Sequence, residues 1–352
     1  MIRPVDSVAA MAAYALADLD SDAFSLAQNE SFLPPSPKVL TAFAKHDTNH
    51  ALYPDPDWTD LRTAIGQHHA LPADQILCGA GSMELIGALI RTFSGPGDSV
   101  LASQYAYAFV STACLQAGST RESCPESDFT VDVDTLLAHT HAPTRIVFVA
   151  NPGNPTGTRL PNTELIRLRD ALPDDVLLIV DEAYGEFDES SADALWPLIA
   201  RGNTVITRSF SKAYALAGAR VGWCALSPTL ATHVRKLLNP NNVSRASQAA
   251  ALAAVQDQQH LAYVVNTTAA ARDHLQAALR RLGVEVPESN TNFVLAVFPD
   301  HATSHAVNTA LRSEGLYARA MDGYGLAHAL RITVADAASM QQVADLVEET
   351  LR

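Results

Sequence analysis

The sequence has few cysteines, no long apolar run and no excess of basic charge. No stretch of about 18 consecutive apolar residues is available to cross a bilayer. The four cysteines occur singly, without the paired spacing of a disulfide framework or a metal site, so we expect packed, reduced thiols at Cys78, Cys114, Cys124 and Cys224.

The charge balance narrows the choice of partners. Lys and Arg total 24 against 38 Asp and Glu, which gives a formal net charge of −14. Nucleic acids and anionic membranes require a basic face, so we expect neither as a partner. The twelve histidines show no H-E-x-x-H spacing, and we expect no catalytic metal. The N-terminus lacks the uninterrupted apolar core of a signal peptide. We therefore expect a soluble cytoplasmic protein that handles small molecules.

Length and composition predict two cores. A chain of 352 residues with 48% hydrophobic and 18% charged residues is able to bury one large core and one smaller core. We predict an N-terminal arm over residues 1–35, a large domain over 36–245 and a small α+β domain over 246–352. The arm is expected to join the small domain or to contact a second subunit.

Short β-branched runs alternate with amphipathic stretches in the predicted large domain. This alternation is typical of βαβ units and a mainly parallel sheet flanked by helices. The fold class is therefore α/β. Strands are expected over Ser99–Ala102, Arg145–Ala150, Leu177–Asp181 and Thr204–Arg208, and in the small domain over Asn292–Val297 and Leu330–Val334.

One lysine lies between hydroxyl side chains and an arginine. A lysine that forms a Schiff base must be positioned and partly desolvated, because only its neutral amine is nucleophilic. Around Lys212, the residues Ser209, Ser211 and Arg220 supply two hydroxyls and one guanidinium that suit a phosphate monoester. The pattern favours an aldehyde cofactor that carries a phosphate. The alternative is a loop with solvated surface charges.

A glycine loop precedes a helical pattern of apolar residues. It reads Gly79-Ala80-Gly81-Ser82-Met83. Exposed N–H groups at a helix N-terminus attract phosphate, so the backbones of Ser82 and Met83 are candidate donors. An ordinary strand-to-helix turn is the alternative.

Three polar residues follow buried strands, where parallel sheets place their active sites. Asn154 lies in a turn fixed by two prolines and two glycines, with its amide available to a ligand oxygen. Asp181 must find a cation at the end of its apolar strand, and Tyr184 lies three residues later. The alternatives are a tight surface turn and a carboxylate that caps the next helix.

An aromatic residue and an arginine complete the set. Tyr105 follows an expected strand and is able to stack on a ring or to pack in the core. Arg331 has apolar residues on both sides and therefore needs an anionic partner. That partner is either a substrate carboxylate, held by two parallel hydrogen bonds, or an internal acid.

Taken in order over nearly the whole chain, these stretches resemble the fold-type I pyridoxal-phosphate (PLP) aminotransferases, in particular the histidinol-phosphate aminotransferase group. The resemblance implies a seven-stranded, mainly parallel sheet and PLP bound to Lys212. Lys212 would also carry the proton between the substrate Cα and the cofactor. Asp181 would pair with the ring nitrogen, and Asn154 and Tyr184 would contact the ring oxygen. Lys212, Asp181 and Tyr184 are thus the expected catalytic residues.

The resemblance also implies the remaining contacts. Tyr53 would reach the cofactor phosphate across a homodimer with a shared active site. Arg331 would bind a substrate carboxylate and Arg319 a substrate phosphate, and Asn29 at the end of the arm is a further candidate for binding substrate.

The implied reaction transfers an amino group between an amino acid or amino-alcohol phosphate and a 2-oxo acid, of the histidinol-phosphate or aromatic type. Two alternatives share the fold. One is a decarboxylase of a phosphorylated amino acid, similar to threonine-phosphate decarboxylase. The other is a non-catalytic PLP-binding protein.

Overall fold

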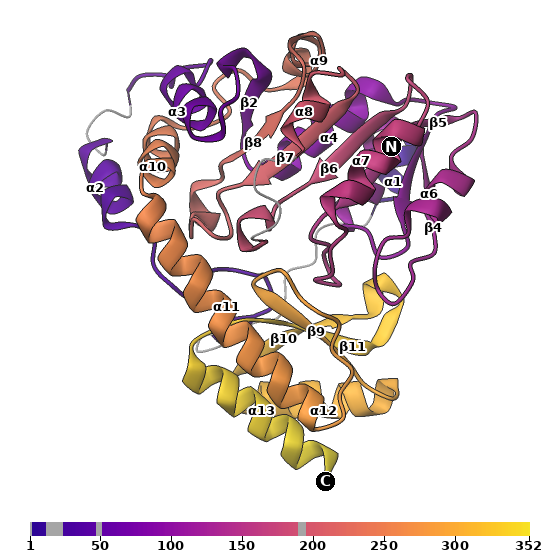
Figure 1. The fold of residues 1–352 in the computed structure, drawn as a ribbon, viewed down its shortest axis with the longest axis vertical. Helices are drawn as coiled ribbons and strands as arrows, with labels where there is room; N and C mark the ends of the chain where they lie inside the picture. Colours follow the sequence, from indigo (N-terminus) through magenta and orange to yellow (C-terminus); the bar gives the residue numbers. More distant parts are fainter. Residues whose placement is uncertain (1, 12–23, 47–50, 189–194) are drawn as a thin grey trace.

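Two sheets organise the computed structural model, which describes residues 2–11, 24–46, 51–188 and 195–352. Figure 1 shows the larger sheet with its helices in the upper part of the molecule and the smaller sheet below. The long helix α11 (Gln258–Arg281) runs from one part to the other.

The large sheet has seven strands in the order β2-β8-β7-β6-β5-β3-β4. Strand β8 is antiparallel to both of its neighbours, and the other pairs are parallel. This confirms the predicted mainly parallel, seven-stranded sheet. Its strands are β2 (Ile76–Gly79), β3 (Ser99–Ser103), β4 (Thr120–Cys124), β5 (Thr144–Ala150), β6 (Leu177–Asp181), β7 (Thr204–Ser209) and β8 (Gly222–Ala225).

Helices flank this sheet (Figure 1), which explains why its central strands are continuous apolar runs rather than alternating ones. Phe148 in β5, for example, is fully buried. The helices of this part are α1 (Asp6–Ala9), α2 (Pro37–His46), α3 (Thr59–His69), α4 (Ser82–Phe93), α5 (Phe109–Ala117), α6 (Val133–His139), α7 (Asn162–Ala171), α8 (Trp196–Ile199), α9 (Pro228–Val234) and α10 (Arg245–Val255). Short 3₁₀ turns occur at η1 (Ala73–Gln75), η2 (Gly185–Phe187), η3 (Ala217–Ala219) and η4 (Arg235–Leu237).

The small sheet has the order β1-β10-β11-β9, with β1 parallel to β10 and the other pairs antiparallel. Its strands are β1 (Phe24–Leu26), β9 (Phe293–Val297), β10 (Leu316–Met321) and β11 (Leu326–Thr333). Besides α11, this part holds α12 (His301–Ser313), α13 (Ala337–Leu351) and the short η5 (Asp322–Tyr324).

The sequence misplaced the bounds of two small-sheet strands. We expected a strand over Leu330–Val334, but β11 begins at Leu326, because Leu326 pairs with Met321 across a bulge. Asn292, expected to open β9, lies in the turn before it.

The two faces of the small sheet have different neighbours. Val294, Leu330 and Ile332 point into the core of the small part. Successive strand residues point to opposite faces, so Arg331 and Thr333 lie on the other face. On that second face, Leu295 and neighbouring apolar residues pack against Tyr105 of the large part. The functional side chains of β11 therefore face the large sheet.

The predicted segment boundaries stay predictions, and the elements beside them pack as follows. Helix α10, just after the expected boundary at residue 245, packs against α2 and α3 and contributes to the large core. The last described part of the predicted arm contributes β1, which pairs with β10. Residues 12–23 of that arm lie outside the described residues.

Candidate active site

The carboxyl ends of β5, β6 and β7 bring three predicted segments together. Asn151 directly follows β5, Asp181 is the last residue of β6 and Ser209 is the last residue of β7. The register pairs Ala150 with Asp181, and Asp181 with Thr207. Because the strands are parallel, their ends meet at one edge of the sheet.

Lys212 lies in the loop after β7 and is partly buried. Its Nζ donates to the backbone carbonyls of Gln28, at 3.0 Å, and Asn29, at 2.9 Å. Burial, reinforced by the positive charge of Arg331, lowers the pKa of Lys212 to about 7. A large fraction of this amine is therefore neutral and nucleophilic near neutral pH.

Asp181 is buried, with 5% of its surface exposed. Thr207 Oγ1 donates to its Oδ1 at 2.6 Å. Burial raises the pKa of Asp181 to about 6; the Thr207 hydrogen bond opposes this, and the charge of Glu182 adds to it. Glu182 itself forms an ion pair with Arg208 at 2.8 Å. A cation placed beside Asp181 would stabilise its ionised form.

Tyr184 lies against the N-terminal segment. Its hydroxyl accepts a hydrogen bond from Asn29 Nδ2 at 2.8 Å, and its ring meets that of Phe293 edge to face. Lys212 Nζ lies 5.8 Å from the centre of the Tyr184 ring. Burial raises the pKa of Tyr184 to about 12. Tyr184 and Asn29 both border the amine of Lys212, and direct contact of the Asn29 side chain with substrate stays a prediction.

Arg331 links β11 to the loop that follows β5. Its Nη1 donates to Asn154 Oδ1 and its Nη2 to the carbonyl of Ala27, both at 2.6 Å. Arg319 lies directly opposite on β10. Within the described ranges, the buried Nε of Arg331 has no hydrogen-bond partner. The guanidinium therefore keeps capacity for an anion.

The glycine loop, the arginine and one predicted serine meet at the N-terminus of α4. Arg220 Nη1 donates to Ser211 Oγ at 3.4 Å. A Cβ on Gly81 would lie 2.5 Å from Arg220 Nη2, and a Cβ on Gly222 would lie 2.3 Å from the backbone nitrogen of Ser82. Only glycine allows these approaches, which leave backbone N–H groups and a guanidinium beside one another.

Four residues that were predicted to contact the cofactor either contact other residues of the chain or are exposed. The Tyr105 ring stacks on Phe129 at a centroid distance of 6.0 Å, and Ser209 Oγ accepts from Ser211 N at 3.1 Å. Met83 is 42% exposed and Tyr53 is 83% exposed. Their roles toward a cofactor stay predictions.

Sequence reasoning missed the residue that shapes the glycine loop. The Glu84 carboxylate accepts from the backbone N–H of Ala80 and from Asn242 Nδ2, both at 2.6 Å. Asn242 Oδ1 in turn accepts from Trp58 Nε1 at 3.2 Å. The acid directly after the loop was visible in the sequence, but nothing there indicated Asn242, which is distant along the chain.

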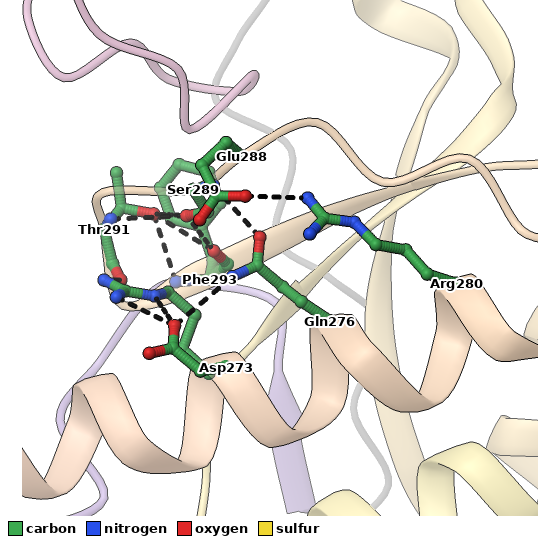
Figure 2. Close-up of polar contacts among 8 residues, drawn as sticks. Asp273, Gln276, Arg280, Glu288, Ser289, Thr291 and Phe293 are labelled. Carbon is green, nitrogen blue, oxygen red and sulfur yellow. Dashed lines mark hydrogen bonds and ion pairs between the residues drawn. The ribbon is translucent and has the colours of Figure 1, made fainter.

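The turn before β9 was also missed. Figure 2 shows how α11 fixes it: Gln276 Oε1 accepts from the N–H of Ser289 at 3.0 Å, and the Ser289 hydroxyl bonds to Phe293 O at 2.6 Å. Asn292 in this turn donates to the carbonyl of Asn29 at 3.0 Å, the same carbonyl that binds Lys212. The Asn290 N–H donates to Gly157 O, which joins the turn to the Asn154 loop.

The described residues form neither a metal cluster nor a membrane-spanning helix. Over the ranges that the structure describes, no group of three or more His, Cys, Asp or Glu residues is arranged to hold a metal ion. In the same ranges, no helix has the length and apolar character to cross a membrane. All four cysteines are buried free thiols.

Comparisons with known proteins agree with this geometry. The family model for aminotransferase class I and II matches residues 21–349. A histidinol-phosphate aminotransferase from Ruegeria is 39% identical over 94% of this chain and 91% of that protein. One from Paramagnetospirillum magneticum is 41% identical over 92% and 90%, respectively.

Solved structures show the same fold. The histidinol-phosphate aminotransferase from Sinorhizobium meliloti, in complex with pyridoxal-5'-phosphate, superposes with a TM-score of 0.91 at 28% identity and covers 100% of this chain and 98% of its own. The aspartate aminotransferase of Thermus thermophilus, a mutant form, superposes with a TM-score of 0.83 at 16% identity over 99% of this chain and 100% of its own, which shows the fold alone. The chain has the fold-type I architecture and belongs to the aminotransferase class I and II family.

Proposed function

We propose that this enzyme is a PLP-dependent aminotransferase whose amino donor is histidinol phosphate and whose acceptor is a 2-oxo acid. The observation that carries the reaction is Lys212, a partly buried lysine whose pKa is lowered to about 7 at the carboxyl edge of the sheet. Relatives at 37–41% identity carry the name histidinol-phosphate aminotransferase, which supports the donor.

The residues at this edge fit PLP. Asp181 is buried, and a cation beside it would stabilise its ionised form, so it would pair with the pyridine nitrogen. Asn154 and Tyr184 would contact the ring oxygen. The N-terminus of α4 would receive the phosphate through the backbones of Ser82 and Met83.

Further side chains would complete the PLP site. Ser209, Ser211 and Arg220 would add contacts to the phosphate, and Tyr105 would stack on the ring. When bound, PLP supplies a carbonyl that takes up the amino group and a ring that accepts electrons.

The chain's own groups handle the proton and the substrate. Neutral Lys212 Nζ would take the proton from the substrate Cα and later return one. Arg331, opposite Arg319 on the same face of the small sheet, would hold the anionic end of the substrate, and two guanidiniums suit a phosphate. Asn29 would border the bound substrate through its contact with Tyr184.

We also propose that the enzyme is a homodimer, that its two domains meet near α10 and α11, and that it is cytoplasmic. The exposed ring of Tyr53 would complete the phosphate site of a second copy, which makes the enzyme a homodimer with a shared active site. The two domains would meet near α10 and α11, where packing passes from the large to the small core. The net charge of −14 and four free thiols support a cytoplasmic enzyme without nucleic-acid or membrane partners.

A spectroscopic titration tests the reaction. The purified protein is mixed with PLP, and its visible spectrum is recorded before and after each amine, with Lys212→Ala as the control. We expect a visible band that Lys212→Ala lacks and that histidinol phosphate, but not phenylalanine, converts to the pyridoxamine form. A missing band contradicts the cofactor, and conversion by phenylalanine alone contradicts the donor. Carbon dioxide release would indicate a decarboxylase instead.

A further inference from the structure

Asn29 occupies an unusual place in the N-terminal segment. It is 1% exposed and has the left-handed backbone conformation, with φ of 55°. Its carbonyl accepts from Lys212 Nζ and from Asn292 Nδ2, and its N–H donates to Thr333 Oγ1 at 3.0 Å. The segment is thus held from both the large and the small part of the molecule.

Both polar atoms of the Asn29 side chain form hydrogen bonds as well. Its Nδ2 donates to the Tyr184 hydroxyl at 2.8 Å, and its Oδ1 accepts from Thr333 Oγ1 at 3.2 Å. A tyrosine hydroxyl has one proton to donate and two lone pairs that accept. Because Tyr184 accepts from Asn29, its own proton is left to point elsewhere.

We infer that Asn29 is a positioning residue that directs the Tyr184 hydroxyl proton toward the cofactor ring oxygen. This inference rests on the proposed function. A phenol that accepts one hydrogen bond becomes a stronger donor in another, since bonds in a chain polarise each other. Asn29 would therefore strengthen the donation from Tyr184 and favour the ring oxygen in its anionic form.

The other charged and titratable groups around Tyr184 come from several elements. Lys212 lies beside its ring, and Asp181, Arg331 and Tyr324 act on its hydroxyl through their charges. Among the residues that the structure describes, it is Asn29, and none of these groups, that hydrogen-bonds to that hydroxyl. Exchanging Asn29 alone thus changes the hydrogen bond while leaving these charges in place.

The test is a pH titration of the cofactor-loaded protein, followed by its visible absorption. The stronger donation from Tyr184 should lower the pKa of the nitrogen that joins Lys212 to the cofactor. The variant Asn29→Gly removes the side chain and tolerates the left-handed backbone. We expect its spectroscopic pKa to rise by about half a unit to one unit, which corresponds to the net free energy of one hydrogen bond.

A double variant separates positioning from a general structural effect. In the Tyr184→Phe background no hydroxyl remains to be directed, so Asn29→Gly should cause no further rise in the spectroscopic pKa. The matched control is Ser31→Ala, because that hydroxyl, among the described residues, bonds to the nearby Leu33 alone. Its titration should coincide with that of the wild type.

Thr333→Val provides a second route if Asn29→Gly fails to fold. It removes the hydroxyl that orients the Asn29 amide, and it should raise the same pKa by a smaller amount. An unchanged pKa in a folded Asn29→Gly, or an equal rise in the Tyr184→Phe background, overturns the inference. A wild type without any visible band would overturn the proposed function instead, so the two failures are distinguishable.

Discussion

The depressed pKa of Lys212 should appear in the stability of the cofactor-free protein. The folded pKa is about 7 against an ordinary value of 10.5. Between these values the unfolded chain binds more protons than the folded chain, so the free energy of unfolding must rise with pH. The slope approaches about 1.4 kcal/mol per pH unit, which amounts to roughly 2 to 3 kcal/mol between pH 6 and 9.

The perturbation is Lys212→Met, which keeps an unbranched side chain and removes the charge. Urea unfolding of both cofactor-free proteins is followed at pH 6, 7, 8 and 9, at one protein concentration. At pH 6 the variant should be the more stable protein, because the wild type must bury a charge or give up its proton. The difference in the free energy of unfolding between the two proteins should shrink toward pH 9, because Lys212 then folds in its neutral form and no longer has to lose its proton or bury its charge.

A surface lysine serves as the control. Lys236 is exposed, and its substitution by methionine should leave the pH dependence parallel to that of the wild type. Parallel curves for Lys212→Met and the wild type would refute the reasoning, since they would mean that Lys212 stays protonated over the whole window.

Three further outcomes are expected. Gly222→Ala places a methyl group 2.3 Å from the backbone nitrogen of Ser82, so the affinity for PLP should fall at least about tenfold in a spectroscopic titration; an unchanged Kd would contradict the tight cradle. Arg331→Lys loses the planar fork, and the KM for the donor should rise about 10- to 100-fold in steady-state assays, whereas an equal KM would place the substrate anion elsewhere. Phe148→Ala, fully buried in β5, should cost about 3–5 kcal/mol in urea unfolding, and a loss below about 1 kcal/mol would mean that the sheet repacks.

Local patterns were enough for the architecture, and they placed several predicted site residues at one edge of the sheet, where their roles stay predictions. Continuous apolar runs predicted the central parallel strands, because such strands are buried on both faces. Polar residues directly after these runs predicted Asn154 and Asp181 at the active edge, since parallel strands end there. The family resemblance then supplied the expected roles of Lys212 and Arg331.

Strand bounds were harder to predict where pairing decides them. The early start of β11 depends on a bulge opposite Met321, and a bulge is a property of two strands together. The register that sets Thr207 beside Asp181 is likewise formed between strands and has no signature in either one.

The sequence by itself determined the fold class, the glycine cradle and the lysine, because each depends on residues that are neighbours along the chain. Only the tertiary structure decided the contacts of Asn29 with Tyr184 and Thr333, which lie 155 and 304 positions away. The lowered pKa of Lys212 also needed the fold, since desolvation depends on everything packed around the amine. Hydrogen bonds and burial act through space, and chain order alone does not specify them.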